Sequence, residues 1–184
     1  MEKSMYFAGV GGQGLQVLGK VIAEVANEKG LYVTYSPKYG TAKRGGLTSC
    51  FVVISDEPIG NPRKKKQDLL LAMEPRAYQQ FCHDVKPGGT LVVNSTLVPQ
   101  TAEPDEGVRQ INVPLHGVCK DLGNTKVIST VALGAMAELL TDMFPDKEAF
   151  LEFALRQLSK KPELAELNKR AFAAGNEAMK KSLA

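Results

Sequence analysis

The sequence predicts an α/β fold, a Rossmann-like doubly wound sheet with a helical C-terminal part, and three observations support this prediction. A short apolar strand over residues 5–8 runs directly into the glycine-rich turn Gly9–Gly14, and an amphipathic helix follows it. Strand patterns then alternate with helix patterns as far as residue 113, and helix patterns dominate beyond it. The chain has 184 residues with neither an internal repeat nor a linker, so a single domain over residues 1–184 is expected.

Three glycines in the first turn are each expected to have a different structural role. Gly9 allows a tight turn, Gly11 lets the backbone approach a ligand, and Gly14 lets the helix pack closely on the strand. The N-terminus of the following helix carries unpaired N–H groups and partial positive charge, which suit a phosphate or a carboxylate. A plain strand-to-helix connection is the alternative, and the site is favoured because a helix follows immediately.

The second strand, residues 31–37, ends without an acidic residue. A NAD-binding unit places Asp or Glu about 20 residues after the glycines, where it bonds the ribose, so NAD is disfavoured. Lys38 leaves NADP open, because a cation there suits an extra phosphate. In the loop that follows, Arg44 offers a forked donor to phosphate or carboxylate, whereas a hairpin with solvated cations is the plainer alternative.

The remaining strands are predicted from short apolar runs bounded by turn residues. They cover residues 47–54, 68–73, 91–94 and 111–113, with a turn at residues 86–90. Glu74 and Pro75 open a helix toward Phe81, because proline is favoured in the first helical turn.

Three helices are expected after residue 113. A segment over residues 126–140, capped by Asn124 or Thr125, is apolar on every face, which predicts a helix buried in the core or against a partner. Pro145 opens the next helix, through residue 158, and Pro162 opens the last, through residue 179.

Composition describes an ordinary globular chain, with 43% hydrophobic and 23% charged residues and a formal net charge of +3. This small charge, without aromatic residues among the basic ones, argues against a nucleic acid partner. The sequence shows no bilayer-length apolar run and no signal-peptide pattern, so no membrane association and a cytoplasmic location are expected. Cys50, Cys82 and Cys119 lie far apart with no CxxC, which indicates reduced thiols and no iron–sulfur or zinc pattern.

No residue fits a catalytic pattern. His83 and His116 are the only histidines, and neither lies in an arrangement that would mark a triad. Cys50 is expected in the core, and Cys119 at a helix start, where a thiol can be acidified. The basic run 63–66 is expected to be a solvated loop. Loops that suit anions, with no visible apparatus for chemistry, indicate a binding or coupling subunit without catalytic residues or metal ligands.

Six segments, in matching order along nearly the whole chain, resemble the gamma subunit of 2-oxoacid:ferredoxin oxidoreductases: GVGGQG, YGTAKRGG, SDEPIG, KPGGTLVVNS, LGNTKVISTVALGA and PELAELNKRAFAAG. The resemblance implies an enzyme that oxidatively decarboxylates a 2-oxoacid, captures the acyl group on coenzyme A and passes electrons to ferredoxin. It implies alpha, beta and ferredoxin-like delta subunits as partners. Thiamine diphosphate and iron–sulfur clusters would lie on those partners, and coenzyme A at the assembled interface. The chain alone would be inactive, and a homodimer is an option for it.

The resemblance also carries binding roles onto two sets of residues, one in each loop. They are Gly9, Gly11, Gly12, Gln13 and Gly14, and Tyr39, Gly40, Arg44, Gly45 and Gly46. Relatives of the 2-oxoglutarate type look like YGPEMRGG, whereas this chain has Thr41, Ala42 and Lys43 before Arg44, and an indolepyruvate-type beta subunit has an RGG loop too.

The substrate expected from the resemblance is 2-oxoglutarate, because SDEPIG and LGNT look more like that group. Branched-chain 2-oxoacids or pyruvate come next. The alternative function is a free-standing Rossmann-like protein that binds NAD(P) or another nucleotide.

Overall fold

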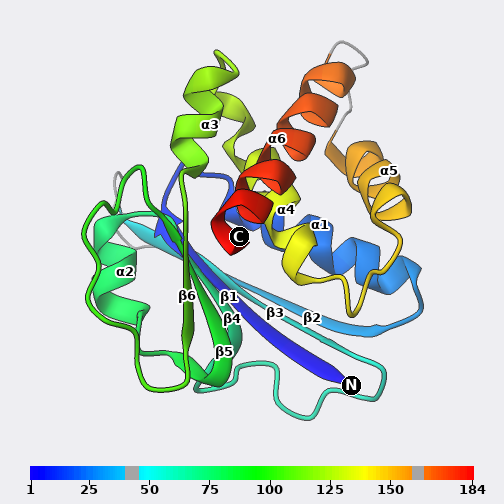
Figure 1. Ribbon diagram of the computed structural model, residues 1–184. Helices are drawn as coiled ribbons and strands as arrows, with labels where there is room; N and C mark the ends of the chain where they lie inside the picture. Colours follow the sequence, from blue (N-terminus) through cyan, green and yellow to red (C-terminus); the bar gives the residue numbers. More distant parts are fainter. Residues whose placement is uncertain (40–45, 159–163) are drawn as a thin grey trace. The chain divides into compact units, whose positions relative to one another are not determined.

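The computed structural model describes residues 1–39, 46–158 and 164–184 (Figure 1). The chain divides into two compact units, Met1–Asn112 and Val113–Ala184. The single domain expected over residues 1–184 stays a prediction.

The sheet has six strands in the order β2-β3-β1-β4-β5-β6. They are β1 (Glu2–Val10), β2 (Tyr32–Lys38), β3 (Leu47–Ser55), β4 (Gln67–Ala72), β5 (Val85–Asn94) and β6 (Arg109–Val113). β4 is parallel to both β1 and β5, whereas β3 is antiparallel to both β1 and β2. The α/β prediction is confirmed, and the sheet is mixed. The connection from β2 to β3 is too short for the crossover of about a dozen residues that parallel strands need.

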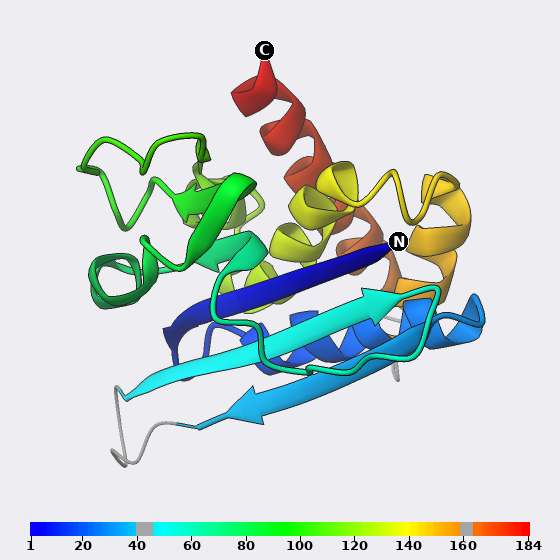
Figure 2. The same ribbon diagram turned by 90° about the horizontal axis from the view of Figure 1, so that it is seen from below.

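Helices α1 (Leu15–Glu28) and α2 (Pro75–Phe81) cover opposite faces of this sheet. Successive strand residues point to opposite faces. On one face Cys50 lies so close to Gly19 of α1 that a Cβ there would be 2.5 Å from its Sγ. On the other face Tyr6 packs edge-on against Phe81 of α2, with ring centroids 5.0 Å apart. Figure 2 shows α1 behind strands β1, β3 and β2.

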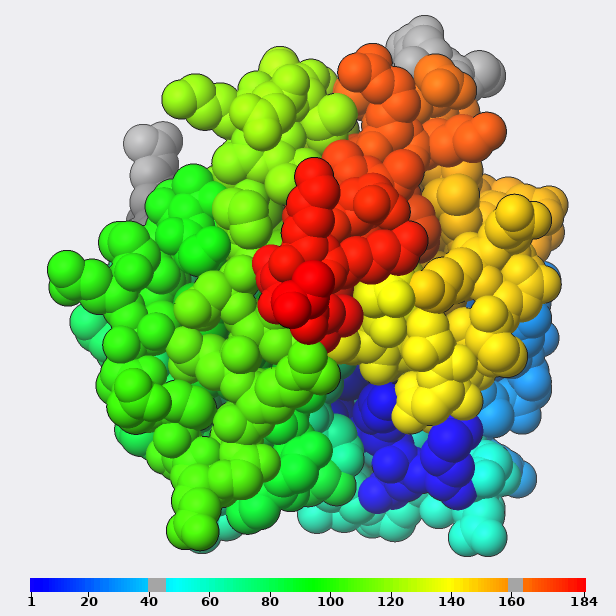
Figure 3. All heavy atoms as spheres, viewed as in Figure 1, coloured from blue at the N-terminus to red at the C-terminus, as the bar shows by residue number. Residues whose placement is uncertain are grey.

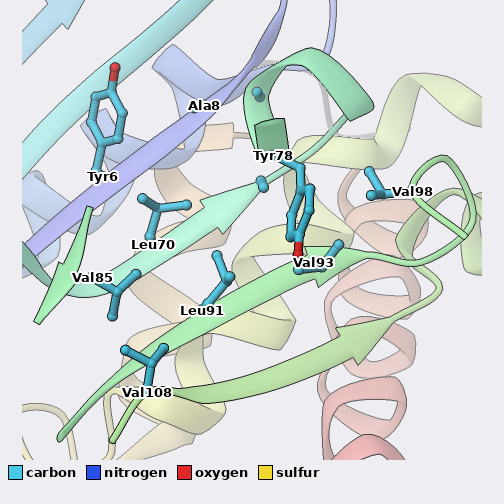
Figure 4. Close-up of a cluster of buried hydrophobic side chains, with 11 residues drawn as sticks. Tyr6, Ala8, Leu70, Tyr78, Val85, Leu91, Val93, Val98 and Val108 are labelled. Carbon is cyan, nitrogen blue, oxygen red and sulfur yellow. The ribbon is translucent and has the colours of Figure 1, made fainter. Parts of the chain in front are cut away.

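The face toward α2 buries a continuous apolar cluster (Figure 4). Its members are Tyr6, Ala8, Leu70, Ala72, Ala77, Tyr78, Val85, Leu91, Val93, Val98 and Val108. At its edge Leu47, Phe51, Phe81 and Cys82 are only partly buried. Tyr6 lies at one end of the cluster, with its hydroxyl pointing away from the aliphatic side chains in Figure 4.

The turn predicted at residues 86–90 is wrong, because these residues belong to β5. The pairing register of β4 and β5 shifts between Gln67 and Leu69, and Gly88 adopts a φ of 80° there. Gly88 N donates to the carbonyl of Gly107 at 2.8 Å. A bulge in a strand and a turn between strands both use glycine, so the sequence signal does not separate them.

The second unit contains α3 (Leu115–Asp121), the 3-10 helix η1 (Thr125–Val127), α4 (Ile128–Leu139), α5 (Lys147–Leu158) and α6 (Ala165–Leu183). Asn124 caps η1 as predicted, since its Oδ1 accepts a hydrogen bond from Lys126 N at 2.9 Å. Helix α4 is buried on nearly every side, as its pattern predicts, and therefore offers little exposed apolar surface. The last turns of α6 lie at the surface (red in Figure 3).

Two glycines bring the backbones of α4 and α6 into direct contact. A Cβ on Gly134 would lie 2.0 Å from the carbonyl oxygen of Phe172. A Cβ on Gly175 would lie 1.9 Å from the carbonyl oxygen of Val131. Both distances are far below van der Waals contact, so this crossing requires glycine on each helix.

A hydrogen-bonded carboxylate joins α4 to the helices around it. Glu138 accepts hydrogen bonds from Lys147 Nζ at 2.6 Å and Asn176 Nδ2 at 2.8 Å. Burial alone would raise the pKa of Glu138, but the hydrogen bonds from Lys147 and Asn176 outweigh it and hold the pKa below the ordinary 4.5. The carboxylate is therefore ionised when it joins these elements.

Glu138→Gln is expected to lower the free energy of unfolding at neutral pH by about 1–2 kcal/mol, because charged hydrogen bonds are lost. A carboxyl whose pKa is depressed by folding stabilises the protein above its unfolded pKa and loses that effect as the pH falls through the folded value. The Tm difference between variant and wild type should therefore shrink on acidification below the ordinary 4.5. Thermal unfolding across this pH range measures it.

Glu177→Gln is the matched control, because the ion pair that Glu177 makes among the described residues is with exposed Lys180 on its own helix, at 2.9 Å. Its Tm should stay close to that of the wild type at every pH. A Glu138→Gln difference that does not change with pH would contradict the ionised network.

Candidate functional site

The structure brings the two predicted loops to the same end of the sheet. In the pairing of β1 with β3, Val10 lies opposite Leu47, so Gly46 lies beside the start of the first turn. Tyr39 directly follows β2, which pairs with β3 on its other edge. The described site residues at this end are Gly9, Gly11, Gly12, Gln13, Gly14, Tyr39 and Gly46. Gly40, Arg44 and Gly45 lie outside the described residues.

Gln16, which the sequence did not single out, ties the first helix to both strand ends. Its Nε2 donates to the carbonyl of Ser49 at 2.8 Å and approaches that of Lys38 at 3.5 Å. Tyr35 Oη donates to Gln16 Oε1 at 2.8 Å. Burial is the main cause that raises the pKa of Tyr35 to about 12, so this hydroxyl stays protonated as a donor. A polar residue in the first turn of a helix carries no sequence signal for such a role.

Gly9 is required by the shape of the turn itself. A Cβ on Gly9 would lie 2.2 Å from Gln13 Oε1 and 2.9 Å from Met73 Cβ. Gln13 Oε1 accepts a hydrogen bond from Val10 N at 2.9 Å, and the residue is buried, with 7% of its surface exposed. The structure therefore places Gln13 back on its own turn, where it holds the backbone in position.

The other glycines of the turn differ from Gly9. Gly12 and Gly14 have φ values of 93° and 70°, in the left-handed region that favours glycine. Gly11 has no positive φ, and a Cβ there would meet no atom within 4 Å. Neither backbone conformation nor contact with other described residues therefore requires glycine at position 11. The exposed backbone there is open to a second molecule.

Helix α1 begins directly after Gly14, and among the described residues no side chain caps it. Its first turn carries no acidic residue. The N–H groups of that turn and the positive end of the helix dipole are available to an anion. The turn also lies between β1 and β4, where the sheet sends helices to opposite faces, a common place for ligands in α/β sheets.

Two buried polar residues hydrogen-bond to the backbone at this end of the sheet. Glu74 is 8% exposed, and its Oε1 accepts a hydrogen bond from Ala77 N at 3.0 Å, which caps α2. Asn94 is fully buried, and its Nδ2 donates to the carbonyl of Met73 at 3.0 Å. The sequence identified Glu74 only as a helix opening and Asn94 only as a strand end. A polar residue directly after a buried strand is the signal that could have found both.

The strand order argues against dinucleotide binding. In a Rossmann unit the second strand lies beside the first, which places the ribose-binding residue near the glycines. Here β3 lies between β1 and β2, and β2 ends at Lys38 with no acidic residue.

Neither buried cysteine is an activated thiol. Burial raises the pKa of Cys50 to about 12 and that of Cys119 to about 11. Cys50 lies in the core as predicted. The acidified position expected for Cys119 is wrong, because its thiol is buried within α3. Within the described ranges there is no group of three or more acidic, histidine or cysteine side chains placed to hold a metal. No described helix is long and apolar enough to cross a membrane.

The family model for pyruvate ferredoxin/flavodoxin oxidoreductases matches residues 4–178. The chain belongs to this family. The predicted resemblance is thereby confirmed, and the homologues are subunits of 2-oxoacid oxidoreductases.

The chain is similar to a curated relative over nearly its whole length. It is 35% identical over 178 residues to the ketoisovalerate oxidoreductase subunit VorA of Methanothermobacter thermautotrophicus, covering 96% of this chain and 36% of that protein. The chain thus spans about a third of the length of this curated relative.

Two solved structures share the fold of this chain. The gamma subunit of a keto/oxoacid ferredoxin oxidoreductase from Geobacter sulfurreducens superposes with a TM-score of 0.84 and 32% identity, over 99% of this chain and 98% of that one. The 2-oxoglutarate:ferredoxin oxidoreductase of Magnetococcus marinus, with 2-oxoglutarate, coenzyme A and succinyl-CoA bound, gives a TM-score of 0.85 and 26% identity. That match covers 98% of this chain and 31% of that one.

Proposed function

We propose that this chain is the gamma subunit of a 2-oxoacid:ferredoxin oxidoreductase, an enzyme that oxidatively decarboxylates a 2-oxoacid to an acyl-CoA. The observation that carries the proposal is the end-to-end match to a gamma subunit, over 99% of this chain and 98% of the other. As a single family domain, the chain would work with alpha, beta and ferredoxin-like delta subunits. Those partners would hold thiamine diphosphate and the iron–sulfur clusters, and ferredoxin would accept the electrons in the cytoplasm.

For the substrate we favour 2-oxoglutarate. The SDEPIG and LGNT segments support it, and the Magnetococcus marinus enzyme, which this chain matches over 98% of its length, is a 2-oxoglutarate oxidoreductase. Branched-chain 2-oxoacids are the second choice, because VorA is a ketoisovalerate oxidoreductase subunit.

Coenzyme A is the ligand proposed for the two loops in the assembled enzyme. Open space beside Gly11 and the uncapped start of α1 support an approaching anion on the first loop. Arg44, with Gly40 and Gly45, extends the same proposal to the second loop, because a guanidinium bonds a phosphate in two places. The Magnetococcus marinus structure contains coenzyme A, which agrees with this ligand class.

The purified chain alone is expected to show no 2-oxoacid-dependent viologen reduction with added thiamine diphosphate and coenzyme A. The described residues offer no metal cluster and no activated thiol for that chemistry. Affinity capture from native cells should instead recover alpha and beta chains, and the captured complex should reduce viologen. Turnover by the single chain, or capture without any partner, would contradict the subunit assignment and favour a free-standing binding protein.

A further inference from the structure

A groove of about 470 Å³ lies in the second unit, between α3 and the last turns of α6 (Figure 1). These two helices contact each other directly. The residues that line the groove come from two short segments, 114–122 and 174–182. Both segments belong to the same unit, and neither has a role in the proposed function.

The two walls of the groove carry side chains of different size. On the α3 wall, Val118 and Leu122 lie four residues apart, and both are only partly buried. On the α6 wall, the small residues Ala174, Ala178 and Ser182 follow one another at the same spacing. Residues four apart lie on one face of a helix. One wall therefore presents branched apolar side chains, and the other leaves space for such side chains.

The two walls also carry opposite charges. Asp121 lies on the α3 wall and Lys181 on the α6 wall, and both are exposed. Among the described residues, the side chains of Asp121 and Lys181 make no hydrogen bond or ion pair. Glu177 also lines the groove, but its carboxylate is paired with Lys180 of the same helix at 2.9 Å. An approaching surface thus meets one unpaired acid on α3 and one unpaired cation on α6.

We propose that this groove is a contact surface between two copies of the chain, related by a two-fold axis that places α3 of each copy on α6 of the other. In such a dimer the same patch serves both copies, so each contact occurs twice. Val118 and Leu122 of one copy fill the space beside the small residues of the other. Asp121 of one copy faces Lys181 of the other.

This orientation follows from the complementarity of the two walls. A two-fold axis that placed α3 on α3 would bring the two copies of Asp121 together, and like charges at an interface are costly. Placing α6 on α6 would bring the two copies of Lys181 together and leave the space beside the alanines unfilled. Only α3 against α6 matches large side chains with small ones and acid with cation. The dimer does not depend on the gamma-subunit assignment.

Sedimentation velocity of the purified full chain tests the dimer. The mass should rise from the 19.9 kDa monomer to twice that value as the concentration increases through the micromolar range. Asp121→Lys and Lys181→Glu should each raise the dissociation constant of the dimer at least about tenfold, because like charges then meet at both symmetric contacts. Lys169→Glu is the matched control, because it reverses the same charge at an exposed position of α6 outside the groove and should leave the dimer unchanged.

Mixing the two charge-reversal variants separates a direct contact from damage to the fold. Asp121→Lys and Lys181→Glu should each be monomeric alone at concentrations where the wild type is dimeric. In the mixture, the lysine introduced at position 121 meets the glutamate introduced at position 181, and the native Asp121 and Lys181 form the other contact. The mixture should therefore form a dimer with an affinity close to that of the wild type.

Three results would refute the dimer. They are a wild-type chain that stays monomeric at millimolar concentration, equal effects of Lys169→Glu and Lys181→Glu, and a mixture that remains monomeric. A monomeric chain whose Asp121→Lys variant also fails to capture alpha and beta chains would assign the groove to a partner subunit instead. The subunit assignment itself is tested separately, by capture with the wild-type chain.

Discussion

Replacing Gly175 by alanine is expected to destabilise the chain by about 3 kcal/mol or more, the upper end for overpacked sites. The new methyl group would lie 1.9 Å from the carbonyl oxygen of Val131, and a backbone atom cannot rotate away as a side chain can. Alanine normally stabilises a helix interior by about 1 kcal/mol relative to glycine, so the expected change has the opposite sign to the helix propensity. A loss of this size lowers Tm by roughly 6–12 °C in a chain of this length.

Thermal unfolding of Gly175→Ala, Gly134→Ala and the double variant measures the contact. Both alanines push the same pair of helices apart, so the double variant should lose less than the sum of the single losses. Ala173→Gly, on the exposed side of α6, is the control and should cost only about 0.5–1 kcal/mol through propensity. A higher Tm for Gly175→Ala would show that the helices do not cross at these two positions.

Local sequence patterns predict where the helices and strands lie. They do not predict which strands run parallel and which run antiparallel. Buried apolar runs located the strands because a strand of this kind has little polar surface anywhere along it. The same run reads identically in either direction, so the position of β3 between β1 and β2 and its antiparallel pairing with β1 came only from the structure. The helix over α4 was found for a related reason, since burial on every side leaves a continuous apolar pattern.

The candidate site could be located from the sequence, but the roles of its residues could not be assigned. A glycine turn between strand and helix marks the end of β1. Which glycines are needed internally depends on contacts from distant parts of the chain, such as Met73 against Gly9. The inward fold of Gln13 and the bridge made by Gln16 are also tertiary contacts, which no spacing rule encodes.

Substitutions at Gly9 and Gly11 are expected to have opposite consequences, because a Cβ would meet close neighbours at Gly9 and none within 4 Å at Gly11. Gly11→Leu is expected to leave the Tm of the purified chain nearly unchanged, because open space surrounds that position and exposed substitutions usually cost within about 0.5 kcal/mol. In the reconstituted enzyme it should raise the apparent Michaelis constant for coenzyme A by about tenfold or more. The added side chain would occupy the space through which the ligand reaches the turn and the first N–H groups of α1.

Gly9→Ala separates this steric block from damage to the turn itself. Its methyl group would displace Gln13 Oε1 and break the hydrogen bond to Val10 N, so the purified chain should lose about 1–3 kcal/mol of stability. Gly11→Leu that instead prevents the subunits from assembling would identify position 11 as a contact with a partner chain. A complex that assembles normally and keeps its coenzyme A kinetics would show that nothing approaches Gly11, and the ligand assignment for the first loop would then be wrong.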